Sequence, residues 1–415
     1  SEPLMLAADT AIVGRLGREE LAALGASSTV LSTLIGLCIF LAYGSTAVVA
    51  RQQGAGNSAA AMSSAMGAVW LAGGLGVILA AIIHLSSDFT AHVFSSSADV
   101  QALTQSYLQI AAWSIPPALI VMATTGALRG VLDLRTPLVV MIAANVFNVL
   151  ATLVLVFGLN WGLPGAAFGL VCAQWFAALC LLITLRRRVR NAGVSVAPEI
   201  SAILASARDG VALFIRTATL RAVLLLAAWL AATMGDVSLA AHQIVMTVVL
   251  ISSFALDAIA IAGQTLTGHA LGAGDRPEAR SITQTLITWG WVSGLVMGLM
   301  IGMGSRVIPT AFSSDGAVGS TAAGGLLVIA IAMPMSGIVY VLDGILIGAG
   351  DGRFLAWAGV ITLVAYLPLA LVVYLSQAGF TALWIAYALF MLVRFVTLWL
   401  RQRHDAWLIL GAQSR

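Results

Sequence analysis

Lysine is absent from this sequence, and charged residues of every kind are scarce. All 20 basic residues are arginines, and Asp, Glu, Lys and Arg together make up only 9% of the 415 residues. A soluble domain carries about a quarter charged residues, so a water-soluble globular enzyme is excluded. Hydrophobic residues make up 60% of the chain, and lipid must therefore be its main solvent.

Cysteine and histidine are also rare, which argues against metal and disulfide chemistry. The three cysteines lie in apolar runs, and packing as small hydrophobic side chains is the favoured interpretation. The five histidines are scattered and form no ligand spacing. The arginines lie at the ends of apolar segments, which indicates membrane topology rather than nucleic-acid binding. We therefore expect no metal, no cofactor, no nucleic-acid partner and no enzymatic activity.

Long apolar runs dominate the chain. A membrane-spanning helix needs about 20 apolar residues. Eleven segments qualify: 21–50, 60–85, 100–128, 137–158, 163–185, 210–234, 239–268, 281–310, 319–349, 354–376 and 380–400. A further run, Leu4 to Val13, is too short to cross, and the sequence begins without Met. We expect this run to be the outer part of a twelfth helix whose beginning precedes the given sequence.

The arginines predict the orientation in the membrane. With the shortened helix counted as the first, loops after even-numbered helices hold fourteen arginines, and the opposite loops hold three. Basic loops stay in the cytoplasm, so both termini should be cytoplasmic and the protein should lie in a bacterial inner membrane. The last three arginines, Arg216, Arg221 and Arg394, fall inside apolar segments.

An internal repeat organises the sequence. A shift of 218 residues superposes rare features without a gap: Gly54-Ala55-Gly56 on Gly272-Ala273-Gly274, Phe94-Ser95-Ser96 on Phe312-Ser313-Ser314, Pro116 on Pro334, and Asp133 and Arg135 on Asp351 and Arg353. Each half has six helices, an even number, so both halves enter the membrane from the same side. The predicted fold is an all-α polytopic membrane protein with two parallel six-helix repeats around a central cavity.

The repeat also predicts the domain organisation. We expect a first six-helix lobe over residues 1–190, a basic cytoplasmic linker over 191–208, a second lobe over 209–402 and a cytoplasmic tail over 403–415. The lipid bilayer is the expected partner, and the chain is expected to be monomeric.

Three carboxylates lie inside apolar segments, where a charge costs at least about 2.5–3.5 kcal/mol. They are Asp9, Asp257 and Asp343, and the shift of 218 places them on Ala227, Ile39 and Thr125. None of the three carboxylates has an acidic equivalent in the other half. This difference between the halves favours specific roles for the three acids over a role in the shared scaffold.

Asp9 lies near the outer end of its helix. It is either a helix-end acid that reaches water or a site that a proton or cation neutralises. Polar residues that could face it are Asn145, Asn148 and Thr152 in segment 137–158 and Gln174 in segment 163–185. Asn148 and Thr152 are one turn apart on one helix face.

The second half offers further polar candidates. Arg216 and Asp257 each lie about 18 residues from the outer end of their helices, about 27 Å deep, so we expect an ion pair. Asp343 is either a solvated helix-end acid or functional. Three other residues could line the cavity: His242, Gln243 and Gln264.

Several motifs resemble one transporter family. The stretch Ala8 to Gly17 is similar to the first-helix signature of the multidrug and toxic compound extrusion (MATE) family. Similarity extends to Gly126-Ala127-Leu128-Arg129-Gly130 and Ala240-Ala241-His242-Gln243-Ile244. The stretches Leu256 to Gln264 and Val341 to Ala349 resemble the DinF-type branch in particular.

This resemblance implies a twelve-helix transporter of two lobes. Such a protein would export cationic, amphipathic, drug-like molecules in exchange for protons or sodium. The first-helix motif puts the family's coupling acid at Asp9, and Pro3, about two turns earlier, could assist a helix bend that has been proposed for the family.

The sequence departs from the family at two places. Many relatives carry an acid where Thr152 stands and a Thr where Leu170 stands. Sodium prefers several oxygen ligands, so the loss of a carboxylate favours proton coupling. Two alternatives remain: a lipid-linked oligosaccharide flippase of the same superfamily, and a major-facilitator transporter, whose Asp-Arg-x-Gly-Arg-type motif is missing from Arg51 to Asn57.

Overall fold

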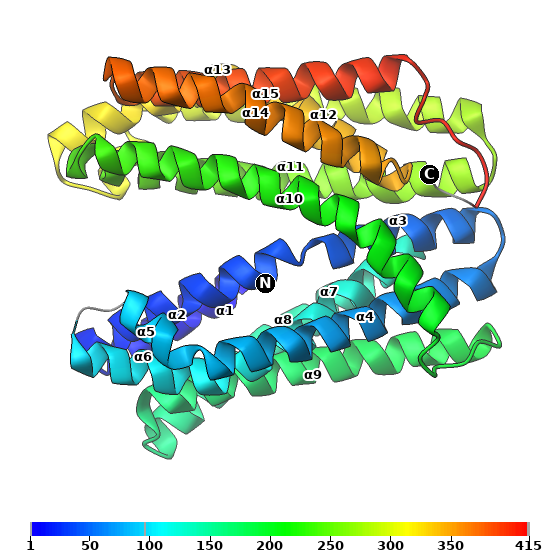
Figure 1. Cartoon of the computed structure of the whole chain (residues 1–415), viewed down its shortest axis with the longest axis horizontal. Coiled ribbons are helices and arrows are strands. Elements are labelled where there is room, and N and C mark those ends of the chain that lie inside the picture. Colours follow the sequence, from blue (N-terminus) through cyan, green and yellow to red (C-terminus); the bar gives the residue numbers. More distant parts are fainter. Residues whose placement is uncertain (1, 95–96, 413–415) are drawn as a thin grey trace. The chain divides into compact units, whose positions relative to one another are not determined.

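The structure is a computed structural model that describes residues 2–94 and 97–412, with the backbone alone for residues 2–4, 6, 7 and 94. In this part of the chain every regular element is a helix (Figure 1). The N-terminal helices are α1 (Glu2–Val13), α2 (Arg18–Leu37), α3 (Phe40–Gly54), α4 (Ser58–Leu85), α5 (Ser87–Phe94), α6 (Ala98–Ala111), η1 (Ala112–Ser114), α7 (Ile115–Gly130), α8 (Arg135–Leu153), the π-helical turn η2 (Val154–Gly158) and α9 (Gly162–Asn191). The remaining helices are α10 (Ile200–Thr233), α11 (Asp236–Gly272), α12 (Arg276–Gly304), η3 (Ile308–Ala311), α13 (Gly316–Gly348), α14 (Gly352–Ser376) and α15 (Phe380–Arg403).

The membrane spans agree with the sequence prediction. Eleven helices in the described residues are long and apolar enough to cross a membrane. Two of them are composite: α2 and α3 join into Arg18–Gly54, and α6, η1 and α7 join into Ala98–Gly130. The 12 residues of α1 are the short first helix of the prediction.

The helix boundaries reproduce the internal repeat. The span Arg18–Gly54 corresponds to α11, since 236 − 18 and 272 − 54 are both 218. Ala98–Gly130 corresponds to α13 by the same shift, since 316 − 98 and 348 − 130 are also 218. The two halves are therefore repeats of one six-helix plan, as predicted.

Close helix contacts repeat with the same shift. A Cβ on Gly76 would lie 2.5 Å from Cα of Pro116, and a Cβ on Gly294 would lie 2.5 Å from the carbonyl oxygen of Met333 and 2.9 Å from Cα of Pro334. Glycine is required at both positions because any side chain would strike the facing backbone. Pro116 and Pro334 are thus equivalent in packing as well as in sequence.

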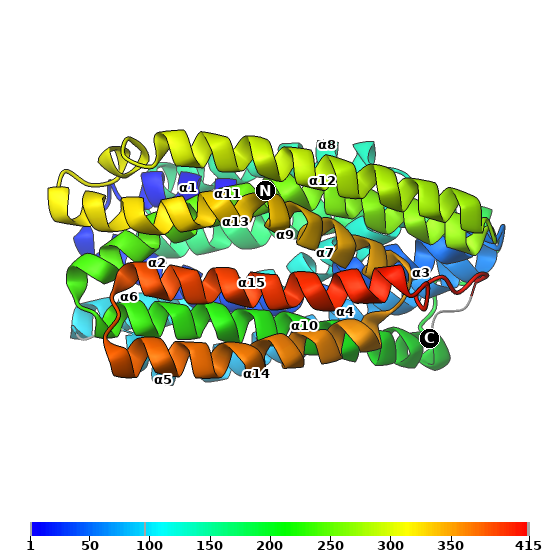
Figure 2. The ribbon, with the colours of Figure 1, turned by 90° about the horizontal axis from the view of Figure 1, so that it is seen from above.

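The chain divides into two compact units. The N-terminal unit contains Ser1–Val49 and Asn57–Gly210, and the C-terminal unit contains Ala50–Gly56 and Val211–Arg415. In the C-terminal unit α13 packs against α11, α12 and α15 (Figures 1 and 2). The segment predicted as the linker, 191–208, runs into α10, which begins at Ile200 and continues across the boundary between the units.

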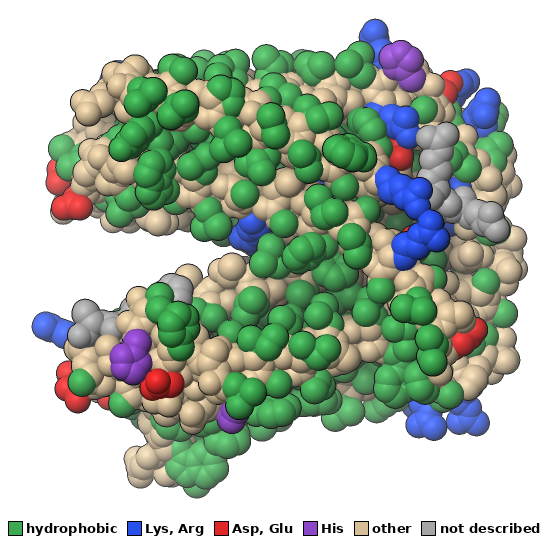
Figure 3. All heavy atoms as spheres, in the orientation of Figure 1, with side chains coloured by type: hydrophobic (Ala, Val, Ile, Leu, Met, Phe, Trp, Pro, Cys, Tyr) green, Lys and Arg blue, Asp and Glu red, His purple; other side chains and the backbone are tan. Residues whose placement is uncertain are grey.

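The outer helix faces are apolar, as lipid requires. Large hydrophobic side chains such as Ile331, Trp357 and Leu375 are 82%, 69% and 70% exposed. Figure 3 shows hydrophobic side chains over much of the visible face of the C-terminal unit, while most of its arginine side chains gather toward one end. This distribution suits helices that contact lipid along their length and water at their ends.

A repeated ion pair follows the fourth of the six helices in each half. Asp133 pairs with Arg188 of α9 at 2.5 Å, and its repeat equivalent Asp351 pairs with Arg401 of α15 at 2.6 Å. Asp133 lies in the connection between α7 and α8. Partial burial acts to raise the pKa of Asp133, but bonds from Thr136 and the Arg188 guanidinium outweigh it, so this pKa lies below its usual value.

Candidate functional site

Asp9 is buried inside the N-terminal unit. It lies on α1, which packs against α2, α8 and α9, and its side chain is 2% exposed. The interpretation of Asp9 as a helix-end acid that reaches water is therefore wrong for this state. A carboxylate in such an environment needs hydrogen-bond donors or a proton.

Thr152 of α8 supplies one donor. Its hydroxyl Oγ1 donates to Oδ1 of Asp9 at 3.2 Å, and the residue is fully buried. Gly169 of α9 leaves room for this hydroxyl, because a Cβ at Gly169 would lie 2.5 Å from Oγ1 of Thr152. The contact predicted from helix spacing is thus present.

Asn148 lies one turn before Thr152 and next to the Asp9 carboxylate. It is fully buried. Its amide makes no hydrogen bond of ordinary length within the described residues, but it lies close enough to interact with the Asp9 carboxylate.

Tyr107 of α6 is part of the same cluster, although the sequence analysis did not select it. The side chain is 1% exposed and interacts electrostatically with Asp9. An aromatic residue in an apolar stretch gives no sequence signal of such a role, because most such residues are packing residues.

The other N-terminal candidates lie near the cluster without a bond to Asp9 in the structure. The Nε2 group of Gln174 approaches the sulfur of Met5, one turn before Asp9, at 3.9 Å. Asn145 is half-buried and donates to the carbonyl of Met141 on its own helix at 2.6 Å. The side chain of Pro3 lies outside the described residues, so its role in bending α1 stays a prediction.

A second polar cluster lies in the C-terminal unit. Arg216 of α10 donates from Nε to Oδ1 of Asp343 on α13 at 3.1 Å, and its Nη2 pairs with Oδ2 of Asp343. Arg394 of α15 reaches Oδ1 of Asp343 at 3.1 Å from the other side. The three side chains are 11%, 8% and 12% exposed for Arg216, Asp343 and Arg394. One carboxylate therefore joins three helices.

This cluster corrects one expectation, because Asp343 is not a solvated helix-end acid. It also shows that Arg216 bonds Asp343, a partner that the sequence analysis did not name. Asp257 is half-buried and interacts electrostatically with Tyr340, as do both arginines. The pair of Arg216 and Asp257 stays a prediction. Depth along a helix does not reveal which face a residue occupies, and the long arginine side chain can reach several neighbours.

The remaining candidates of this unit are dispersed over α11. His242 is 2% exposed and stacks on Trp384 with ring centroids 5.3 Å apart, whereas Gln243 is exposed. Gln264 is 2% exposed, and its backbone packs tightly against Gly348 of α13. A small cavity between α11, α13 and α15 is lined by Ser253, Tyr340 and Tyr387 among others.

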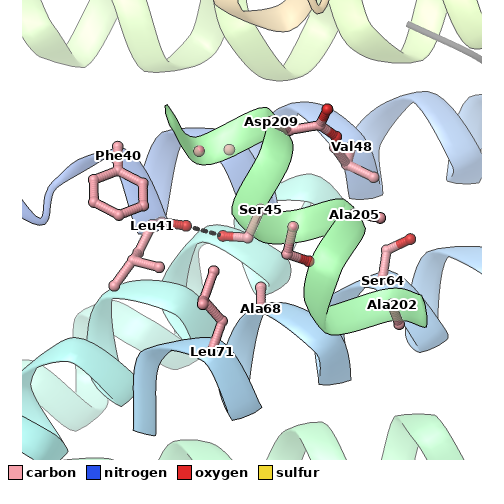
Figure 4. Close-up of a pocket in the computed structure, with 13 residues that line it drawn as sticks. Phe40, Leu41, Ser45, Val48, Ser64, Ala68, Leu71, Ala202, Ala205 and Asp209 are labelled. Atoms are coloured by element: carbon pink, nitrogen blue, oxygen red, sulfur yellow. Dashed lines mark hydrogen bonds between the residues drawn. The ribbon is translucent and has the colours of Figure 1, made fainter. Parts of the chain in front are cut away.

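A separate cavity lies in the N-terminal unit between α3, α4 and the first turns of α10 (Figure 4). Its wall combines apolar side chains with hydroxyls and one carboxylate: Phe40, Leu41, Leu71, Ser45, Ser64 and Asp209. None of the candidates from the sequence lines it. The Ser45 hydroxyl already has a hydrogen-bond partner, because its Oγ donates to the carbonyl of Leu41 at 2.7 Å. Among the described residues, no group of three or more His, Cys, Asp or Glu side chains could hold a metal ion.

Two six-helix repeats and buried charges within the spans define a class, the polytopic secondary transporters. The particular family follows from comparison with known proteins. The chain matches the MatE family over residues 1–154 and 213–372. It therefore belongs to the MATE family, whose members are transporters rather than enzymes. This match also decides against the major-facilitator alternative.

Known relatives come from plants and bacteria. The chain is 30% identical over 411 residues to Protein DETOXIFICATION 44, chloroplastic, of Arabidopsis thaliana, covering 95% of this chain and 78% of the relative. It is 26% identical over 422 residues to DNA damage-inducible protein F of Escherichia coli, covering 98% and 90%.

The fold is also that of solved MATE structures. A crystal structure of MATE in the bent conformation superposes with a TM-score of 0.89 at 19% identity, over 97% of this chain and 92% of that one. The bent form of Vibrio cholerae VcmN superposes with a TM-score of 0.87 at 18% identity, over 97% and 93%.

Proposed function

We propose that this transporter is a proton-driven antiporter that exports cationic, amphipathic, drug-like molecules, with Asp9 as the coupling residue. The observation that carries the proposal is the buried Asp9 carboxylate, which accepts a hydrogen bond from Thr152 and lies next to the buried Asn148 amide. A relative of 27% identity over 304 residues is named a probable multidrug resistance protein, NorM, in Thermotoga maritima. That name supports the substrate class.

Coupling follows from competition at one site. A buried carboxylate is far more stable when it is neutral, so it binds either a proton or a cation. If the cationic substrate and the proton each favour a different state of α1, binding of one releases the other. The proton gradient then drives export.

The donor set favours a proton over sodium. A hard cation needs several oxygen ligands, and the observed oxygens are one carboxylate, the Thr152 hydroxyl and the Asn148 carbonyl. A proton needs only the carboxylate. We further propose that the chain acts as a monomer in a bacterial inner membrane, with both termini in the cytoplasm, because fourteen arginines lie on that side against three on the other.

The test is transport of ethidium in proteoliposomes under an imposed proton or sodium gradient. Asp9→Asn keeps the shape and hydrogen bonding of the side chain but removes its titration. We expect this variant to lose proton-driven efflux almost completely while it still folds. Asp88→Asn is the control, since Asp88 is an exposed acid of α5 whose partner is His92.

Two results would contradict the proposal. Transport by Asp9→Asn at the wild-type rate under a proton gradient would remove Asp9 as the coupling residue. Transport by the wild-type protein under a sodium gradient alone would replace the proton by sodium.

A further inference from the structure

The segment after the last helix folds back onto the C-terminal unit. α15 ends at Arg403, and the following residues Trp407 and Leu408 are only 1% and 4% exposed. The backbone N–H of Gly411 donates to the carbonyl of Leu271, near the end of α11, at 2.9 Å. We call residues 404–412 the C-terminal strap. The described part of the tail expected from the sequence thus packs on this unit.

Arg51 holds the strap from the inside. This residue is 1% exposed. Its guanidinium donates to the carbonyls of Ala349 at 2.5 Å, Ile409 at 2.6 Å and Gly411 at 2.9 Å. Ala349 caps the C-terminal end of α13, where the helix dipole places partial negative charge. A buried arginine is thus satisfied by carbonyl groups, and two of its three carbonyl partners belong to the strap.

Arg51 lies on a helix that both units share. α3 begins in the N-terminal unit, but Ala50–Gly56 belongs to the C-terminal unit. Gly54 lacks a side chain where the backbone of His269 approaches, and Gly272 lacks one where the backbone of Arg51 approaches. The shift of 218 relates Gly54 to Gly272 and Arg51 to His269, so the crossing of α3 and α11 is symmetric. The two sides of the crossing differ in one respect: the α3 side carries the Arg51 side chain, which bonds the strap.

We propose that the C-terminal strap is a conformational latch that holds the end of α3 on the C-terminal unit and detaches during each transport cycle. The proposal rests on the proposed function, because a transporter must rearrange its helix ends between states. The contacts of the strap with the rest of the C-terminal unit are few enough to break and re-form. Trp407 and Leu408 anchor it by burial. Hydrogen bonds with Arg51, Leu271 and Gln52, whose Nε2 donates to the carbonyl of Ala412 at 3.4 Å, and the ion pair of Asp405 with Arg280 add to this hold. Segments with so few buried contacts open locally at low free energy.

Cysteine labelling of the strap tests the latch. Cys38, Cys172 and Cys180 are first replaced by Ala in the full chain. The Leu408→Cys and Leu410→Cys variants then offer a matched pair, because Leu408 is 4% exposed and Leu410 is 41% exposed. N-ethylmaleimide should modify the Leu408→Cys variant slowly at rest and at least about tenfold faster during ethidium transport, while the rate for Leu410→Cys stays constant.

A second experiment compares labelling rates in the resting protein, without transport. Arg51→Met removes every guanidinium bond and should raise the resting labelling rate of the Leu408→Cys variant about tenfold or more. If Arg51→Met fails to fold, Gly411→Pro replaces it in this comparison. Proline removes the N–H that bonds the carbonyl of Leu271 and cannot adopt the φ of +95° at Gly411.

The outcomes separate the latch from the proposed function. An unchanged Leu408→Cys labelling rate during measured transport would make the strap a fixed cap and overturn the latch. An unchanged resting rate in both Arg51→Met and Gly411→Pro would show that these bonds do not hold the strap, which also overturns it. Absence of proton-driven transport in the wild-type protein would instead refute the proposed function.

Discussion

Substitution of Gly169 disturbs the Asp9 site without replacing any polar side chain. In Gly169→Ala the new Cβ would lie 2.5 Å from Oγ1 of Thr152 and 3.2 Å from its Cα and backbone N. The hydroxyl must move, and its bond to Asp9 is then lost. We expect a loss of about 1 kcal/mol for the hydrogen bond and about 1–3 kcal/mol for overpacking between α8 and α9.

Two measurements follow this change. Thermal unfolding in detergent reports the stability, and proton-driven ethidium efflux from proteoliposomes reports the coupling. Gly73→Ala is the matched control, because the nearest atom to its new Cβ is 3.8 Å away and alanine favours helices over glycine. The control should unfold at the wild-type temperature or slightly above, and its transport should be unchanged.

A double-mutant cycle decides whether the effect on transport passes through Thr152. Thr152→Ala removes the hydroxyl directly, so adding Gly169→Ala should reduce transport little further. The stability loss should persist in part, because the backbone of Thr152 stays close. The reasoning is refuted if the two transport losses add in full, or if Gly169→Ala transports like the wild-type protein.

Two further predictions concern the ion pairs. Asp343→Asn should destabilise the C-terminal unit by about 3–5 kcal/mol, because it leaves Arg216 and Arg394 buried without their carboxylate. Arg216→Met should cost less, and equal losses in thermal unfolding would contradict the bridging role of Asp343. Asp133→Asn should lose a stability contribution that is fully present above the usual carboxyl pKa of about 3.9 and disappears as the pH falls through the lowered folded pKa. Unfolding of both proteins between pH 7 and 3 checks this, and a difference that grows toward low pH would contradict it.

The Asp9 site was largely predictable from the sequence, and the Asp343 cluster was not. Asn148 and Thr152 are four residues apart, and helix geometry alone puts them on one face. The family motif marked Asp9 as the coupling acid, and the structure joins it to this face through the hydrogen bond from Thr152. Arg216 and Arg394 were recognisable as charges inside apolar segments, but their partner depended on how α10, α13 and α15 are rotated about their axes. Apolar sequences around a buried charge carry little information on that rotation.

The membrane spans and the internal repeat can be recognised from the sequence alone. Lipid demands about 20 apolar residues in each span, so the eleven segments stand out, and one shift of 218 residues relates both the motifs and the helix ends. Three contacts depend on the folded structure: Asp343 joins two arginines, Tyr107 lies in the Asp9 cluster, and Arg51 bonds the C-terminal strap. These contacts join residues far apart in the chain, and the reason for each lies in packing. A buried polar group must find a partner among whatever atoms the folded helices bring to it.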